Sequence, residues 1–333
     1  MRRLTRTPSD VNSNEKERGV IAPLAAILMV ALLGFGALAV DVGAIYSEKA
    51  QLQNGADSAA LAIAQSCKKT ASTAPCAADQ KVQAAPFANG NALDGSSNVV
   101  SATVSSAGAT GTVDVTTETP VGADGEHFSL YLARVLGINS MEIRATAQAQ
   151  WTNPTKGRSI LPLVFSPCEF IDDGQPHKIL IQGGGLDCNG LNPSNQAYQG
   201  GFAWLLPNGE EPCEVNAEIG AWSDGSTGAA VPHGCLPLFE GGSLAGSTVA
   251  LPVYSTTNGE QGSNAEYMIS KWAGFKVLAW NLTAQAKYDP SNIFTGSEKG
   301  IYGTFVGYSA DPGLFTGTSP TPTGNVFIIE LTK

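Results

Sequence analysis

The sequence predicts an α+β protein: one N-terminal transmembrane helix that continues outward as a long helix, a small α+β unit, and a mainly antiparallel, sandwich-like β ectodomain. Residues 20–40 form 21 consecutive positions without a charge, and residues 41–66 are rich in helix-forming side chains and contain no proline. After residue 152, short apolar runs alternate with turn residues, as is typical of a β-rich domain. The predicted segments are a cytoplasmic tail (1–19), a transmembrane helix (20–40), a long helix with a small α+β unit (41–151) and a β-rich domain (152–333).

The uncharged stretch has the length of a membrane-spanning helix. At about 1.5 Å per residue it extends about 31 Å, close to the hydrocarbon thickness of a bilayer. A secretory signal is the alternative, but its apolar region is shorter, about 7–15 residues, and ends at a small-residue cleavage site. Leu38-Ala39-Val40-Asp41 fits such a site poorly, whereas Gly36-Ala37-Leu38 leaves the alternative open. We therefore expect a retained anchor in the lipid bilayer.

The distribution of charge predicts the orientation of this anchor. Residues 1–19 hold five of the 19 basic residues, while the whole chain has a net charge of −10. The positive-inside rule therefore places the N-terminus in the cytoplasm and residues 41–333 outside the cell membrane. An acidic ectodomain argues against nucleic acid as a partner, because phosphate binding needs a basic surface.

The cysteines agree with export. All six follow the uncharged stretch: Cys67, Cys76, Cys168, Cys188, Cys213 and Cys235. An even number on the oxidising side of a membrane predicts three disulfides, and we expect neighbours in the sequence to pair, although other pairings among the last four remain open. No CxxC or HxxxH spacing is present, so neither a metal site nor a cofactor is predicted.

The segment after the span continues as a helix to about Ser66. Its apolar side chains recur at helical spacing on one face: Ile45, Leu52, Ala56, Ala59 and Ile63. This stripe could pack against the protein's own ectodomain or against the same helix of another subunit.

The rest of the chain is predicted as short elements. Residues 67–98 indicate a disulfide-closed turn and loop, followed by two strands, a short amphipathic helix and a third strand: Val99–Ser105, Thr112–Thr117, His127–Leu136 and Met141–Trp151. Beyond residues 153–157, seven apolar runs predict a sandwich or barrel-like domain: Ile160–Phe165, Ile179–Gln182, Phe202–Leu206, Thr248–Tyr254, Tyr267–Trp280, Gly300–Ser309 and Asn325–Leu331.

One string of residues carries a family resemblance. Glu17-Arg18-Gly19 precedes the span, Leu38-Ala39-Val40-Asp41-Val42-Gly43 marks its outer edge, and Tyr46 and the run from Leu52 to Ala62 follow. This string resembles the N-terminal TadE/TadG-like segment of TadG-like tight-adherence (Flp) pilus assembly proteins. The motif residues that could contact another subunit are Asp41, Gly43, Tyr46, Leu52, Gln53, Asn54 and Asp57.

The resemblance implies a non-catalytic, pilin-like membrane component that supports pilus biogenesis and surface attachment. Its implied partners are pilus-assembly membrane proteins and pilin-like subunits. Prepilins of this system carry a glutamate five residues after the cleavage glycine, but counting from Gly19 that position is Leu24. We therefore expect no processing by the prepilin peptidase.

Two other functions remain as alternatives: a free-standing membrane-anchored surface binding or adhesion protein, and an envelope hydrolase. A hydrolase needs a nucleophile with an oriented base, yet the chain has three histidines, at predicted surface or turn positions, and no GxSxG motif. Asp172 and Asp173 supply too few oxygens for calcium. We interpret Asp41 as an interfacial charge that sets the depth of the span. Asp57 is either solvated, bonded within the chain, or part of a subunit contact.

Overall fold

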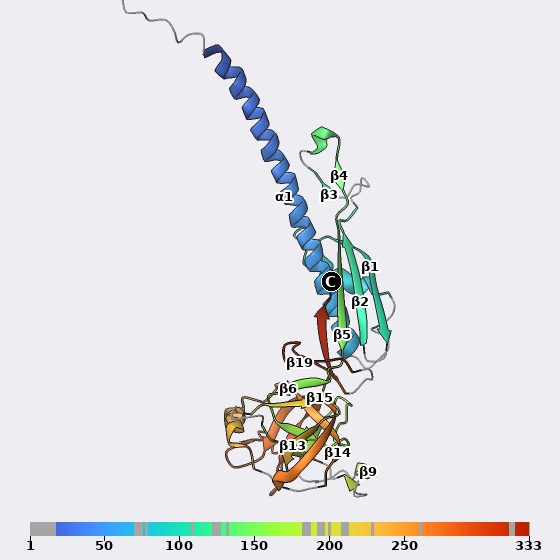
Figure 1. Cartoon of the computed structure of the whole chain (residues 1–333), viewed down its shortest axis with the longest axis vertical. Helices are drawn as coiled ribbons and strands as arrows, with labels where there is room; N and C mark the ends of the chain where they lie inside the picture. The colour runs from blue at the N-terminus through green and yellow to red at the C-terminus, as the bar shows by residue number, and fades with distance from the viewer. Residues whose placement is uncertain are drawn as a thin grey trace, which may run out of the picture.

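The computed structural model is elongated, with one long helix leading to a sheet and then to a β-rich body at the far end (Figure 1). It describes residues 18–69, 76, 79–107, 110–121, 128–130, 133–181, 188–191, 197–198, 201–207, 213–227, 230–259, 262–319 and 324–332. The predicted α+β class, with a long apolar N-terminal helix and a mostly antiparallel β-rich C-terminal region, is confirmed.

The first helix, α1 (Arg18–Lys69), runs unbroken for 52 residues, or about 78 Å. It ends three residues beyond the predicted Ser66. Cys67, in its last turn, is bonded to Cys76, which ties the end of the helix to the chain that follows. The predicted apolar stripe faces the protein's own sheet, since Leu52, Ala56 and Ile63 are almost completely buried.

A five-stranded sheet covers the second half of α1, in the order β1-β2-β5-β20-β18. Neighbouring strands are antiparallel except for β18 and β20. The strands are β1 (Asn98–Ala107), β2 (Thr110–Glu118), β5 (Arg144–Thr152), β20 (Val326–Leu331) and β18 (Tyr308–Ser309). In β2 and β5 buried and outward-facing side chains alternate, which is why the sequence predicts them well.

The predicted loop over residues 67–98 is partly wrong, because Lys81–Gly90 forms the helix α2. Pro86 lies inside this helix and its N-cap residue, Gln80, makes no side-chain capping bond. Its stability therefore comes from burial: Ala84 and Ala88 pack against the first helix and the sheet. Tertiary contacts of this kind leave little trace in the local sequence.

The predicted amphipathic helix over His127–Leu136 is also wrong in the part that the structure describes. Phe128–Ser129 is a strand, β3, paired with β4 (Ser140–Met141), and only the 3₁₀ turn η2 (Ala133–Leu136) is helical. Gly137 adopts a positive φ of 84°, which ends the turn and returns the chain to the second strand. Residues 127 and 131–132 lie outside the described residues.

The C-terminal strand β20 crosses back into the sheet on α1 and pairs with β5, so the sheet includes residues from the far end of the chain. Asn153 stands where the two connections to the β-rich body lie side by side. Its side-chain N–H donates to Val326 O at 2.7 Å, its carbonyl accepts from Ser319 N at 2.8 Å, and its Oδ1 accepts from Lys68 Nζ at 3.3 Å. Asn153, which lies in one connection, therefore bonds to the end of the first helix and to the other connection.

The β-rich body is built on an eight-stranded sheet whose strands partly close on themselves. β13 pairs with both β11 and β15, and the order β13-β11-β7-β14-β15 therefore forms a ring. Closure of the five strands gives the β-rich body a barrel-like part. Its strands are β7 (Leu163–Phe165), β11 (Phe202–Leu205), β13 (Trp222–Ser226), β14 (Thr248–Thr257) and β15 (Ala265–Asn281).

The remaining elements extend or cover this ring. β17 and β8 continue the sheet from β15, β6 pairs with β12 and β19, and β9 pairs with β10. Their bounds are β6 (Lys156–Ser159), β8 (Pro176–Leu180), β9 (Cys188–Leu191), β10 (Ala197–Tyr198), β12 (Val215–Glu218), β16 (Lys287–Tyr288), β17 (Gly300–Phe305) and β19 (Phe315–Thr316), with short helical turns η3 (His233–Cys235), α3 (Leu236–Phe239), η4 (Glu240–Gly242) and η5 (Gly262–Asn264).

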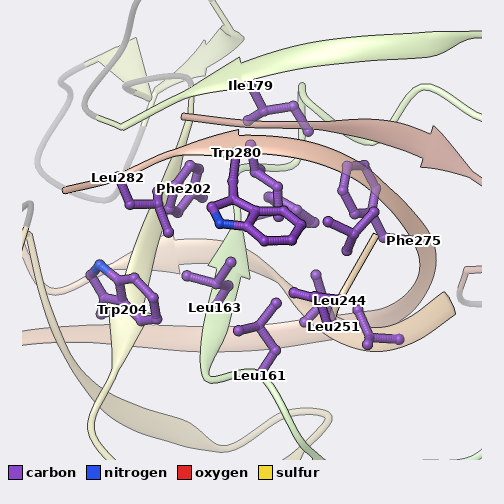
Figure 2. Close-up of a cluster of buried hydrophobic side chains, with 14 of the residues drawn as sticks. Leu161, Leu163, Ile179, Phe202, Trp204, Leu244, Leu251, Phe275, Trp280 and Leu282 are labelled. Atoms are coloured by element: carbon purple, nitrogen blue, oxygen red, sulfur yellow. The ribbon is translucent and has the colours of Figure 1, made fainter. Parts of the chain in front are cut away.

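Aromatic side chains dominate the larger core of the β-rich body (Figure 2). Phe165 makes edge-to-face contacts with Phe275 and Phe305, whose ring centroids lie 5.2 and 5.6 Å away. Alternate residues of the same strands enter a second core, since Leu163 belongs to one cluster and Val164 to the other. Both faces of these strands are buried, which explains why they read as short continuous apolar runs.

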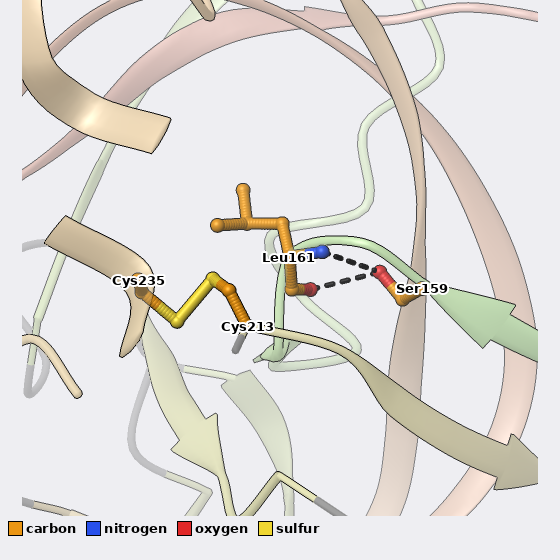
Figure 3. The surroundings of a disulfide bond; sticks show 4 residues. All are labelled: Ser159, Leu161, Cys213 and Cys235. Carbon is orange, nitrogen blue, oxygen red and sulfur yellow. Dashed lines mark hydrogen bonds between the residues drawn. A yellow bond between two sulfur atoms is a disulfide. The ribbon is translucent and has the colours of Figure 1, made fainter. Parts of the chain in front are cut away.

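Two of the predicted disulfides are present, Cys67–Cys76 and Cys213–Cys235. The second joins the segment before β12 to η3, and Cys235 is fully buried beside Leu161 (Figure 3). Cys168 is also disulfide-bonded. The side chain of its expected partner, Cys188, lies outside the described residues, so that pairing stays a prediction.

We expect Asn153→Ala to destabilise the protein by about 1–3 kcal/mol, because buried donors and acceptors lose their partner. Asn216 is an exposed asparagine of β12, so Asn216→Ala is the matched control and should change stability little. The free energies of unfolding from urea titrations of both variants give the comparison. Equal values for the two variants would show that the Asn153 bonds contribute nothing.

Candidate functional site

The first half of α1 is exposed in the single chain. Every large apolar side chain from Ile21 to Val40 has more than half of its surface open, from Leu28 at 55% to Phe35 at 72%. By length and composition this helix could cross a membrane. A helix with this apolar surface needs a lipid or protein environment, as the sequence predicts for an anchor or a signal sequence.

The second half of the same helix is part of the core. Its small residues let the sheet approach closely: Ala56, Ala59, Ala60 and Ala64 have no exposed surface. Thr117 of β2 donates its hydroxyl to the carbonyl of Leu52 at 2.9 Å, which adds a buried hydrogen bond across the same contact. The motif region of α1 therefore divides into an exposed segment and a packed segment.

Asp41 stands at the boundary between these segments. It is 3% exposed, and its Oδ2 accepts a hydrogen bond from the backbone N–H of Ala133 at 2.8 Å. The tip of the β3–β4 hairpin therefore covers Asp41, and the interpretation of this residue as an interfacial charge that sets the depth of the span stays a prediction. The carboxylate binds the first N–H of η2, a position where helical turns have unpaired donors.

Gln53 and Asp57 act within the chain. The Gln53 side chain donates one hydrogen bond to Asp57 Oδ1 at 2.8 Å and another to Thr146 O of β5 at 3.0 Å. Of the alternatives for Asp57, the structure contains the bond within the chain, one helical turn from its partner.

Gly55 explains why the motif has a glycine in mid-helix. A Cβ added here would lie 3.1 Å from backbone atoms of Ala88 in α2, so the two helices approach too closely for a larger side chain. Gly43 differs, because a Cβ there would meet nothing within 4 Å. Gly43 and Asn54 are exposed, as is Tyr46 at 72%.

The motif residues thus separate by role. Leu52 and Gln53 contact the sheet, and Asp57 accepts a hydrogen bond from Gln53. Asp41 accepts a hydrogen bond from the hairpin. Gly43, Tyr46 and Asn54 face outward and are the ones still available to a second molecule. The partners that sequence reasoning missed, Ala88, Thr117 and Ala133, are bound through backbone or small side chains, which give no recognisable local signal.

A second set of polar residues lies in the loop between β7 and β8 and at the start of β8. His177 Nε2 is 2.8 Å from Asp173 Oδ1, and this bond lowers the pKa of Asp173. Glu169 is 7% exposed, and its Oε1 accepts from Gly201 N at 2.7 Å. Burial raises the pKa of Glu169, while the bond from Gly201 and the nearby His177 lower it. Within the described ranges, no three His, Cys, Asp or Glu residues are grouped to hold a metal.

The fold and this site define a class: a protein whose N-terminal helix is both a candidate membrane span and part of the core beneath the five-stranded sheet. Residues 19–66, which lie within α1, match the family model described as "Putative Flp pilus-assembly TadE/G-like". This match confirms the resemblance of the N-terminal segment and supports involvement in Flp pilus assembly. No curated protein and no solved structure matches the chain.

The two glycines provide a matched test of this division. We expect Gly55→Leu to destabilise the protein by about 1–3 kcal/mol, because the side chain must displace α2. Gly43→Leu should leave stability unchanged or raise it by up to about 1 kcal/mol, since leucine favours the helix. Thermal unfolding of the full chain in detergent measures both. A Gly55→Leu variant as stable as Gly43→Leu would contradict the close contact between the helices.

Glu169 predicts a pH dependence of stability. Because its folded pKa is raised, the folded state binds more protons than the unfolded state, so stability falls as pH rises from the ordinary glutamate pKa of about 4.3 to the higher folded value. Glu169→Gln removes this titration. We expect the melting temperature of the variant relative to the parent to be higher near neutral pH than near about pH 4.

Glu240→Gln, at an exposed position, controls for the loss of one negative charge. Melting temperatures measured across that pH range decide the prediction. A difference between Glu169→Gln and the parent that is constant with pH would contradict it.

Proposed function

We propose that the protein is a non-catalytic, single-pass membrane component of a tight-adherence (Flp) pilus assembly system, with a pilin-like helix that supports pilus biogenesis and surface attachment. The observation that carries this proposal is the coincidence of the family match with one helix. Residues 19–66 include the exposed apolar segment and the packed segment of α1. An exposed apolar segment that continues directly into a packed segment is expected of a subunit anchored in a membrane.

The proposed orientation follows from charge and cysteine chemistry. The basic residues before the span favour a cytoplasmic N-terminus, and residues 41–333 then lie outside the cell membrane. The disulfides Cys67–Cys76 and Cys213–Cys235 fit this side, since disulfides persist in oxidising compartments.

Several features of the site favour a structural role over catalysis. The Asp173–His177 pair could orient a base, but Asp173 is exposed and the bond lies in a surface turn. Glu169, the buried carboxyl nearby, is bonded to a backbone N–H. These bonds stabilise the loop. The surface that remains for partners is the outward face of the first helix around Gly43, Tyr46 and Asn54, where pilin-like subunits or assembly proteins would pack.

Deletion and complementation test the assembly role. We expect deletion of the gene to abolish or reduce Flp pili in electron micrographs and to lower attachment to surfaces. Complementation with Tyr46→Ala should restore less than the parent, because the exposed ring at the proposed contact is lost. Trp222→Ala, which truncates an exposed aromatic side chain in β13 of the β-rich body, should restore fully.

Each outcome of the deletion decides between functions. Normal pili with normal attachment would contradict a role in pilus assembly. Normal pili with weak attachment would instead favour the free-standing surface adhesion protein. Equal rescue by Tyr46→Ala and Trp222→Ala would show that the outward face of the helix is not the contact.

A reporter fusion tests the orientation. Alkaline phosphatase joined after Lys333 should be active in a bacterial host, because the enzyme folds only where its disulfides form. A fusion to β-galactosidase at the same point should be inactive. The reverse result would place the β-rich body in the cytoplasm and contradict the proposed orientation.

A further inference from the structure

A hairpin beside α1 lies where the uncharged stretch of the helix ends (Figure 1). β3 and β4 form its two strands, and residues 133–138 form its tip. Leu130 N–H donates to Asn139 O at 3.0 Å, and Ile138 N–H donates to Ala133 O at 3.0 Å. These bonds make the hairpin tip a compact turn with a defined direction.

Two contacts fix the height of the hairpin along the helix. At its base, Phe128 packs against the buried cluster that contains Leu52 and Ile143. At its tip, Ala133 N–H donates to Asp41 Oδ2 at 2.8 Å. Since Leu52 and Asp41 are 11 residues apart in one helix, the hairpin rises about 16 Å toward the span.

The hairpin tip exposes apolar and basic side chains together. Ile138 is 53% exposed, and Arg134 is also exposed. One exposed isoleucine means little by itself, because folded proteins expose much apolar surface. Its position is informative here. The tip is bonded to Asp41, and the residue before Asp41 is Val40, the last of the uncharged stretch.

We propose that the hairpin tip rests on the surface of the bilayer, with Ile138 at the boundary between acyl chains and headgroups and Arg134 beside lipid phosphates. Apolar groups meet acyl chains at this boundary, and basic groups are attracted by anionic headgroups. The inference rests on the proposed membrane anchoring of the first helix. It adds a second point of contact between the ectodomain and the membrane.

Lipid is favoured over a second protein copy as the occupant. A retained span brings the bilayer to the hairpin tip within the same molecule, so the contact costs little additional translational freedom. A second copy would have to be recruited and oriented at a larger entropic cost. The contact with lipid would limit the tilt and rotation of the ectodomain about α1.

Spin labels on the full chain, reconstituted into vesicles that contain anionic phospholipid, test the proposal. Among the described residues no cysteine is free, so an introduced cysteine can be labelled selectively. Ile138→Cys reports on the hairpin tip, and Leu33→Cys reports on the span. Val82→Cys is the aqueous control, at an apolar residue that is 88% exposed in α2. Collisions with oxygen, which concentrates in lipid, are compared with collisions with a nickel chelate, which stays in water.

We expect the label at residue 138 to collide less with the nickel chelate and more with oxygen than the label at 82. Its accessibility to both reagents should be intermediate between that of the label at 82 and that of the label at 33. Equal accessibility at 138 and 82 would overturn the lipid contact. Protection at 138 from both reagents would indicate cover by protein and also overturn it. A water-accessible label at 33 would instead refute the membrane anchor itself, which separates that failure from failure of the hairpin contact.

Charge reversal gives a second measurement. In the Ile138→Cys background, Arg134→Glu should increase collisions with the nickel chelate in anionic vesicles but not in vesicles of neutral lipid. Lys287→Glu makes the same change of charge at an exposed position in the β-rich body and should have no effect at 138. Equal effects of the two substitutions, or no effect of either, would contradict a contact between Arg134 and headgroups.

Discussion

The close packing of one helix on one sheet is the interaction on which the rest of the structure depends. The second half of α1 approaches the sheet and α2 through small residues such as Ala56, Ala59 and Gly55. Larger side chains would push the layers apart and weaken the dispersion contacts. Because the same helix continues into the uncharged stretch without a break, this packing also sets the direction of the uncharged stretch relative to the sheet.

This arrangement places opposite demands on residues only a few turns apart. The uncharged stretch needs an apolar environment, whereas most side chains of the motif from Leu52 onward are buried or hydrogen-bonded within the chain. Asp41 lies between these two segments of the helix. Burying a carboxylate costs free energy unless it is hydrogen-bonded. The N–H of Ala133 supplies such a bond, and the hairpin that carries it is thereby brought to the edge of the span.

The sequence predicts the elements whose signals are local. The unbroken helix, the alternating strands β2 and β5, and the Cys67–Cys76 bond all follow from spacing within a short window. The sequence does not predict the elements that depend on contacts between residues far apart in the chain. α2 is held by burial despite Pro86, Phe128 becomes a strand because Met141 pairs with it, and the last strand enters a sheet that begins at residue 98. At the site, the motif marks the right helix, but the roles of Asp41 and Gly55 depend on Ala133 and Ala88.

The joint at Asn153 extends the rigidity of the helix to the β-rich body. Asn153 lies in the crossing that enters β6. Its side chain donates to Val326 in the crossing that leads to β20 and accepts from Lys68 near the end of the helix. A single crossing would leave the body free to swing, as linked domains usually do. With two crossings and a buried amide between them, movement of the body requires breaking hydrogen bonds at the joint. The β-rich body is therefore held about 42 Å beyond the end of the uncharged stretch, which is the helical rise from Asp41 to Lys69 at the end of α1.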